Sequence, residues 1–266
     1  YARLSDEREE AEFTVRKLQQ FAASEGYSFN DFAIFYRTHA QSRPFEDVLR
    51  REKIPYQIVG GLRFYDRKEI KDILAYFKLI VNPADSVSLK RVINVPARGI
   101  GKGTLEKLEL KLFEESQNGS SFMPTLWKTL EKAAQGDPAV TSLLSPRVAR
   151  KLAGFVNLMR SFEESRVGLS LSELYSLVLE QTGYVRGLKG EETPEAAERL
   201  KNLEEFDRMI REFEEDQLTK TEKALLLPLF VEQTSLITDE NKHYEGASVK
   251  LMSLHSSKGL EFPIVF

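Results

Sequence analysis

The chain has 266 residues, 41% of them hydrophobic, and a formal net charge of −3. It is long enough for one large or two modest domains with cores of their own, and it lacks the overall positive charge typical of nucleic-acid-binding domains. Cysteine is absent, which excludes a disulfide framework, a cysteine nucleophile and thiolate metal sites.

Neither a metal site nor a membrane segment is indicated by the sequence. The three histidines, His39, His243 and His255, are too scattered to suggest a shared metal ion. The longest apolar run, Ala224 to Val231, is too short to span a bilayer. The N-terminal residues show no signal-peptide pattern. We therefore expect a soluble, cytoplasmic protein with no membrane partner.

The N-terminal part of the chain predicts a helix followed by a β-α-β unit. Apolar residues recur at helical spacing after Ser5, a suitable N-cap, and Gly26 is a suitable helix end. The uninterrupted apolar run at 32–36 is typical of a parallel strand buried on both faces. A second helix is expected from Ser42, and a second strand at 56–59.

Two loops in this region carry side chains suited to nucleic acid. Arg37, Gln41 and Ser42 precede or begin a helix, where donors can bind a phosphate; a helix cap with surface arginines is the alternative. Residues 60–72 join two glycines to an aromatic and basic run. Such a run suits a single strand, because bases stack on aromatic rings. Aromatic rings that fill the core are the alternative.

After a helix expected from about Asp66 to Val81, helical patterns separated by turn residues continue to about Tyr244. The clearest, at 195–216, has an apolar stripe and an acidic face that we interpret as solvated. Strand patterns return only at Ser248. This order predicts an α/β fold, a discontinuous parallel-sheet domain with a large all-α insertion. The expected ranges are 1–84 and 245–266 for the sheet domain and 85–244 for the insertion.

A glycine-rich segment lies at residues 96–105, within the expected insertion. It is not a Walker phosphate loop, because Pro96 and Gly103 stand where that motif needs glycine and a hydroxyl residue. A helix-hairpin-helix fits better, since hairpin amides and a helix N-terminus can bind duplex phosphates without reading the base sequence. A plain glycine turn is the alternative. The candidate duplex contacts are Arg98, Gly99, Ile100, Gly101, Lys102 and Thr104.

The final stretch, Ser248 to Phe266, predicts a strand, a polar loop and the start of another strand. In open α/β sheets, ligands bind at the carboxyl ends of the strands. This loop offers His255, Lys258 and Glu261 for such a role, although an ordinary connection with solvated charges is the alternative.

Three segments together resemble one protein family. Residues 251–262 are similar to motif V of superfamily 1 DNA helicases of the UvrD/PcrA/Rep type, Leu-Met-Thr-Leu-His-x-Ala-Lys-Gly-Leu-Glu-Phe, with Ser253 for Thr and Ser257 for Ala. Residues 36–43 resemble the Tyr-Arg-x-Asn-Ala-Gln-Ser-Arg segment of these helicases, with His39 for Asn. Residues 60–72 resemble their Gly-Gly-x-Arg-Phe-x-Glu-Arg-x-Glu-Ile-Lys-Asp segment, with Asp66 for Glu.

The resemblance implies an internal piece that covers most of the second RecA-like domain, 2A, and all of the helical domain 2B. The parent enzyme would move 3′ to 5′ on single-stranded DNA, using ATP and Mg²⁺ to separate duplex DNA in repair or replication. The hairpin would grip the duplex, as a similar Arg-Gly-Ile-Gly element does in domain 2B of the family. Repair proteins could also bind through domain 2B.

The same resemblance assigns site residues. Those expected at the nucleotide are Lys258, Gly259 and Glu261, and those expected at single-stranded DNA are Arg37, His39, Arg63, Phe64 and His255. No Walker A or acidic Walker B segment is present, and phosphoryl transfer needs both. We therefore expect no catalytic residue, no metal ligand and no ATPase or helicase activity in this chain alone. A non-enzymatic DNA-binding or protein-interaction module is the alternative function.

Overall fold

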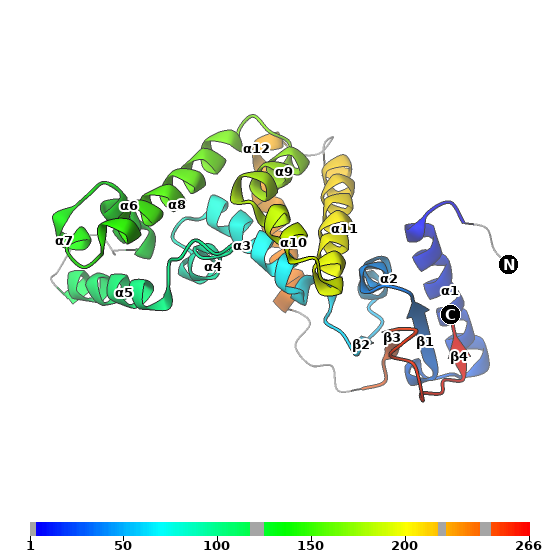
Figure 1. Cartoon of the computed structure of the whole chain (residues 1–266). Coiled ribbons are helices and arrows are strands. Elements are labelled where there is room, and N and C mark those ends of the chain that lie inside the picture. Colours follow the sequence, from blue (N-terminus) through cyan, green and yellow to red (C-terminus); the bar gives the residue numbers. More distant parts are fainter. Residues whose placement is uncertain (1–3, 118–124, 218–221, 240–245) are drawn as a thin grey trace. The chain divides into compact units, whose positions relative to one another are not determined.

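The computed structural model describes residues 4–117, 125–217, 222–239 and 246–266, which form two compact units (Figure 1). The sheet unit comprises the described residues of Tyr1–Ile70, Ala197–Glu205 and Ser235–Phe266. The helical unit comprises those of Lys71–Ala196 and Phe206–Thr234.

The sheet contains four parallel strands in the order β2-β3-β1-β4. Their bounds are Phe32–Tyr36 for β1, Tyr56–Val59 for β2, Val249–Ser253 for β3 and Ile264–Val265 for β4. Strand β3 pairs with β1 through Leu251 opposite Ile34, and with β2 through Leu251 opposite Ile58. The sheet therefore joins strands from the two ends of the sequence, blue and red in Figure 1, which confirms the predicted α/β class.

Helices α1 (Glu7–Glu25) and α2 (Ser42–Arg51) contribute to one hydrophobic core with the strands. The N-cap of α1 is Asp6 rather than the predicted Ser5, because the Asp6 carboxylate accepts from Glu9 N at 2.7 Å. Ser5 instead donates its hydroxyl to the Glu9 carboxylate at 2.6 Å. The helix ends at Gly26 as predicted, with φ at 75°. The buried core residues are Ala11, Val15, Leu18, Phe32, Ile34, Tyr36, Phe45, Val48, Leu49, Ile54, Tyr56, Val249 and Leu251.

Three short 3₁₀ segments lie beside the strands: η1 (Phe29–Asp31), η2 (His39–Gln41) and η3 (Phe64–Asp66). The helices that follow are α3 (Lys68–Val81), α4 (Ser86–Val92), α5 (Lys102–Gln117), α6 (Leu126–Ala134), α7 (Pro138–Thr141), α8 (Pro146–Ser165), α9 (Leu171–Thr182), α10 (Tyr184–Glu191), α11 (Pro194–Gln217) and α12 (Lys223–Asp239). In the part of the chain that the structure describes, no helix has both the length and the hydropathy to cross a membrane.

Aromatic edge-to-face contacts form the centre of the helical unit. Phe230 of α12 lies 6.0 Å from Phe77 of α3 and 5.9 Å from Phe206 of α11, measured between ring centroids. Tyr175 of α9 lies 5.7 Å from Phe206. Such pairs contribute beyond the area that they bury. Four helices far apart in sequence therefore share this core.

The boundaries between the two units fall inside helices α3, α11 and α12. The expected boundary at 84/85 follows the loop after α3, whereas the second expected boundary, at 244/245, falls on residues outside the described ranges. The middle of α11, Ala197–Glu205, belongs to the sheet unit, and the flanking turns belong to the helical unit. Helix α11 therefore has residues in both units.

Candidate nucleic-acid interface

The loops that follow β1, β2 and β3 meet at the carboxyl edge of the sheet. A Cβ atom at Gly60 would lie 2.8 Å from Oγ of Ser256, and one at Gly61 would lie 2.7 Å from Cε1 of His39. Gly60 also has a φ of 73°, in the left-handed region. Position 60 therefore favours glycine through both its backbone conformation and the close Ser256 side chain, a side chain at Gly61 would displace the His39 ring, and the three segments that carry the helicase resemblance lie in direct contact.

The loop after β1 is closed by its own side chains. Gln41 Oε1 accepts hydrogen bonds from the amides of Arg37 and Thr38, both at 3.0 Å. Ser42 is fully buried, and its hydroxyl donates to the Glu46 carboxylate at 2.6 Å. Of the three phosphate donors expected here, Arg37 and Gln41 are exposed and Ser42 is buried, and the Gln41 amide oxygen is already used by the loop's own amides.

His39 is half-buried at this edge, and its ring meets the ring of Tyr36 edge to face at 5.8 Å. The Nδ1 atom of His39 and the hydroxyl of Tyr36 are buried without a hydrogen-bond partner in the structure. Burial raises the pKa of the Tyr36 phenol, so it stays protonated as a potential donor. Unsatisfied buried polar atoms of this kind call for an explanation, and ligand binding is one.

The loop after β3 presents charged side chains to solvent. It is closed by a hydrogen bond from Ser257 N to Ser253 O at 3.2 Å and one between the hydroxyls of Ser253 and Ser256 at 2.9 Å. His255, Lys258 and Glu261 are all exposed on this loop, and Gly259 has a φ of 86°. An imidazole, an ammonium and a carboxylate are thus displayed at one edge of the sheet, next to the His39 loop.

A buried arginine lies beneath these loops. Arg67, 5% exposed, donates to the backbone oxygen of His39 at 2.7 Å, to Oγ of Ser42 at 2.9 Å and to Oδ1 of Asn202 on α11 at 2.8 Å. Its guanidinium also lies 5.0 Å from the centroid of the Phe64 ring. Burial lowers the pKa of Arg67, and the nearby Glu46 carboxylate opposes that shift.

Glu46, 1% exposed, accepts hydrogen bonds from the Ser42 hydroxyl at 2.6 Å, from Phe64 N at 3.1 Å and from the Tyr56 hydroxyl at 3.4 Å. Burial raises the pKa of this carboxyl, while the Ser42 hydrogen bond and the Arg67 charge act in the opposite direction. Neither Glu46 nor Arg67 was expected as a site residue, because their roles depend on burial that sequence spacing does not reveal.

The two aromatic and basic residues expected at single-stranded DNA differ in exposure. Phe64 is 0% exposed, so no base can stack on its ring, and the core alternative describes it. Arg63 is half-buried, and its guanidinium lies 5.7 Å from the centroid of the Tyr56 ring. Of this pair, only Arg63 has accessible surface at the edge of the sheet.

The segment expected to form a helix-hairpin-helix consists of α4, residues 93–101 and α5. The amide oxygen of Asn94 accepts from Arg98 N at 2.8 Å and from Ile100 N at 3.1 Å. Ile100 is 1% exposed and anchors the hairpin, and Gly99 has a φ of 68°. Gly101 O accepts from Thr104 N at 3.0 Å, where α5 begins.

The Arg98 side chain points into the helical unit and not toward solvent. Its Nη1 atom donates to the backbone oxygens of Val92 at 2.9 Å and Val95 at 3.1 Å, and Nη2 donates to the Tyr76 hydroxyl at 2.6 Å. The guanidinium also lies 5.3 Å from the Phe155 ring centroid. The phosphate contact expected through Arg98 stays a prediction; in the structure these bonds satisfy the Val92 carbonyl at the end of α4 and the Val95 carbonyl that follows it.

Two lysines provide the positive charge around the hairpin instead. The Lys102 side chain is 92% exposed and lies 3.6 Å from the Glu106 carboxylate. Lys151 of α8 donates to Gly99 O at 3.3 Å. Sequence reasoning missed Lys151 because it lies far along the chain. The grouping of the basic residues Arg147, Arg150 and Lys151 is the sequence feature that weakly indicates a role for Lys151.

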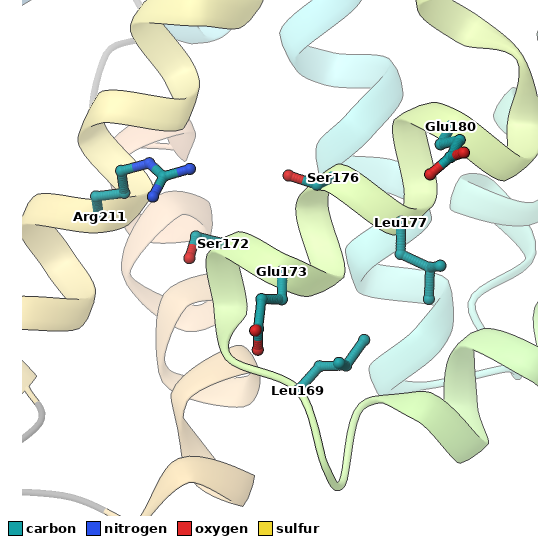
Figure 2. Close-up of a pocket in the computed structure, with 7 residues that line it drawn as sticks. All are labelled: Leu169, Ser172, Glu173, Ser176, Leu177, Glu180 and Arg211. Carbon is teal, nitrogen blue, oxygen red and sulfur yellow. The ribbon is translucent and has the colours of Figure 1, made fainter.

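A shallow pocket of about 300 Å³ lies between α9 and α11 in the helical unit. Figure 2 shows Glu173 and Glu180 on α9 and Arg211 on α11 around it. Arg211 donates to Asp207 at 2.9 Å. The described residues contain no group of three or more histidine, cysteine, aspartate or glutamate side chains placed to hold a metal ion.

Comparison with known proteins places these features in one family. The whole chain, residues 1–266, matches the profile of the UvrD-like helicase C-terminal domain. It is 38% identical over its full length to the ATP-dependent DNA helicase PcrA of Staphylococcus aureus. It is 40% identical, over 98% of its length, to the ATP-dependent DNA helicase UvrD1 of Mycobacterium tuberculosis. The chain spans about a third of the length of these relatives, 34% in each case.

The buried Glu46 predicts a pH dependence of stability. Because its folded pKa lies above the unfolded value of about 4.3, the folded chain holds this proton to higher pH. Its contribution to stability is therefore present below the unfolded pKa and lost as pH rises through the folded pKa. We expect the free energy of unfolding of wild type, minus that of Glu46→Gln, to fall as pH increases from about 4.3.

Urea unfolding at a series of pH values, followed by circular dichroism, measures this difference. Glu25→Gln, at an exposed position on α1, is the matched control and should leave the pH profile unchanged. If the free energy of unfolding of wild type and of Glu46→Gln changed in parallel with pH, the Glu46 carboxyl would have the same pKa in the folded and unfolded states. That result would contradict the prediction.

Arg98→Ala should destabilise the helical unit, because several carbonyl oxygens and the Tyr76 hydroxyl lose a charged donor. Hydrogen bonds to charged groups contribute about 1.5–3 kcal/mol, so the loss should be at least of that size. Fluorescence of Trp127, the single tryptophan of the chain and part of the helical unit, reports the urea midpoint. Lys102→Ala should shift the midpoint little, and equal midpoints for both variants would contradict a structural role for Arg98.

Proposed function

This chain belongs to the UvrD-like helicase C-terminal domain family, and from that premise we propose that it is an internal part of an ATP-dependent DNA helicase. Its role is to supply contacts to single-stranded and duplex DNA and part of the ATP site. The main observation that supports the proposal is that the loops after β1, β2 and β3 meet at one edge of the sheet. The helicase names of PcrA and UvrD1 support the substrate class.

In this proposal residues 1–84 and 245–266 form most of domain 2A, and residues 85–244 form domain 2B. The parent enzyme moves 3′ to 5′ along single-stranded DNA and unwinds duplex DNA in repair or replication. The location in this proposal is cytoplasmic. Repair-protein partners bind through the helical unit.

Single-stranded DNA contacts the carboxyl edge of the sheet. Arg37 and His255 supply exposed donors to phosphates, and Arg63 adds a half-buried guanidinium. His39 has an unpaired Nδ1, and its ring lies against Gly61. An imidazole can donate to a phosphate or stack on a base.

The ATP contact lies on the loop after β3. The Glu261 carboxylate can accept from ribose hydroxyls, the Lys258 ammonium can attract phosphates, and Gly259 allows the turn between them. Mg²⁺ would neutralise phosphate charge in the parent enzyme. We assign no metal ligand and no catalytic residue to this chain.

Duplex DNA contacts the hairpin of the helical unit. Backbone groups of Gly99 and Gly101 and the first turn of α5, with Thr104, face a phosphate, while Lys102 and Lys151 neutralise its charge. Ile100 holds the hairpin from inside. These contacts bind without reading the base sequence, which suits an enzyme that acts on any duplex.

The ATP site is composite in this proposal, so the isolated chain should hydrolyse no ATP, with or without single-stranded DNA. In the full-length protein, Glu261→Gln should raise the KM for ATP, because a neutral amide accepts less strongly from ribose. A coupled ATPase assay measures both. Glu25→Gln is the control for an exposed glutamate. DNA-stimulated hydrolysis by the isolated chain would contradict the composite site, and no hydrolysis by the full-length protein would favour a non-enzymatic module.

The hairpin contact predicts a salt effect. In the full-length protein, Lys102→Ala and Lys151→Ala should each weaken duplex binding and reduce the slope of log affinity against log salt by about 1 per lost phosphate contact. Fluorescence anisotropy of a labelled duplex in increasing KCl measures the slope. Lys189→Ala, on exposed α10 surface, should leave it unchanged. An unaltered slope in both hairpin variants would leave the plain glycine turn as the explanation.

A further inference from the structure

We propose that Arg67 is a positioning residue for single-stranded DNA: it holds the His39 loop in its binding conformation by tying the loop's backbone to helix α11. The inference rests on the proposed single-strand contact by His39. It assigns a specific task to a buried guanidinium that has no expected contact with DNA or nucleotide.

The hydrogen bonds of Arg67 determine one orientation for its side chain. Nη2 donates both to His39 O at 2.7 Å and to Ser42 Oγ at 2.9 Å, while Nη1 donates to Asn202 Oδ1 at 2.8 Å. The Phe64 ring covers the guanidinium at 5.0 Å. A planar group held at both nitrogens and on one face cannot rotate without breaking several of these contacts.

Asn202 is itself held in place. Its Nδ2 donates to the buried Glu69 carboxylate at 2.6 Å, so its Oδ1 faces Arg67. Asn202 is 3% exposed and belongs to the part of α11 that lies in the sheet unit. A continuous chain of hydrogen bonds therefore leads from Glu69 through Asn202 and Arg67 to the backbone of His39.

The hydrogen-bond partners of Arg67 indicate that it positions the His39 loop more than it stabilises the fold. The three oxygens that accept its hydrogen bonds are a carbonyl, a hydroxyl and an amide, all neutral, while the Glu46 carboxylate acts on it through space. Burying a cation against neutral acceptors is an inefficient way to stabilise a fold, since desolvation is large. Such networks do, however, specify a single geometry.

The His39 ring depends on this geometry. Its Cε1 atom lies where a Cβ at Gly61 would come within 2.7 Å, and its edge contacts the Tyr36 ring. The ring therefore has little free space around it, and a shift of the His39 backbone oxygen would move the ring away from Gly61 and Tyr36. Release of the Arg67 hydrogen bond should permit that shift.

Arg43 provides a matched comparison. It is similarly buried, 7% exposed, and also reaches α11, with Nη1 3.1 Å from the Glu205 carboxylate and Nε 2.8 Å from Asp47. Its partners are carboxylates on α11 and α2, whereas Arg67 bonds the His39 backbone. Loss of either arginine should destabilise the sheet unit, but only loss of Arg67 should act on the His39 loop.

The test uses the full-length protein with Arg67→Ala, Arg67→Lys and Arg43→Ala, below their melting temperatures. Readouts are the Tm, the affinity for labelled single-stranded DNA, and the DNA concentration that gives half-maximal ATPase stimulation.

We expect Arg67→Ala to weaken the affinity for single-stranded DNA about tenfold, as when residues that orient metal-binding side chains are removed. Arg43→Ala should lower the Tm with little change in DNA affinity. Arg67→Lys should not restore affinity, because an ammonium lacks the planar fork.

Three further variants separate the possible results. If His39→Ala leaves single-strand affinity unchanged, the proposed contact fails and the inference with it. If His39→Ala weakens affinity but Arg67→Ala does not, only the positioning role is overturned.

Adding Arg67→Ala to His39→Ala should cause no further loss, because both act through one contact. Asn202→Ala should give a smaller loss of the same kind. Equal losses in Arg67→Ala and Arg43→Ala would show a general structural effect and overturn the proposal.

Discussion

Strand β3 pairs in parallel with both β1 and β2, and the sheet unit depends on these two ladders. Strands β1 and β2 are close in sequence but are not neighbours in the sheet, because β3 lies between them and pairs with both. Because all strands run in one direction, their carboxyl ends lie at one edge. The return of the chain at Val249 therefore completes the sheet and brings the polar loop at 254–261 beside the loops from the N-terminal part.

At that edge, close backbone approach and buried polar contacts determine what each motif residue does. Gly60 and Gly61 allow the turn after β2 to touch Ser256 and His39. Beneath the turn, Glu46 and Arg67 satisfy backbone and hydroxyl groups that the loops leave in the interior. The charged residues of the motifs thus divide into two sets. The side chains of the first set are exposed at the surface. Those of the second set are buried and hold the loops in place.

The hairpin of the helical unit shows the same division. Arg98 turns inward to the carbonyl oxygens at the end of α4, whereas Lys102 remains in solvent. Lys151 reaches the hairpin from α8 and adds charge that the local sequence lacks. A chain with a net charge of −3 can in this way still present a basic surface to a polyanion.

The sequence by itself determined the α/β class, the helices and strands of the N-terminal part, the helix at 195–216 and the three helicase-like segments. Apolar runs at 32–36 and 249–253, glycine at position 26 and the stripe of α11 are local signals of strand, helix end and helix. The family relationship also follows from the sequence, because it depends on residue identities.

Only the tertiary structure decided the strand order, the burial of Phe64 and the directions of Arg67 and Arg98. A basic or aromatic residue in a motif has the same one-dimensional pattern whether it faces DNA or the core. Its direction depends on partners such as Asn202 and Tyr76, which lie far away along the chain. Hydrogen bonds across such separations form only when the chain has folded, so no local pattern contains them.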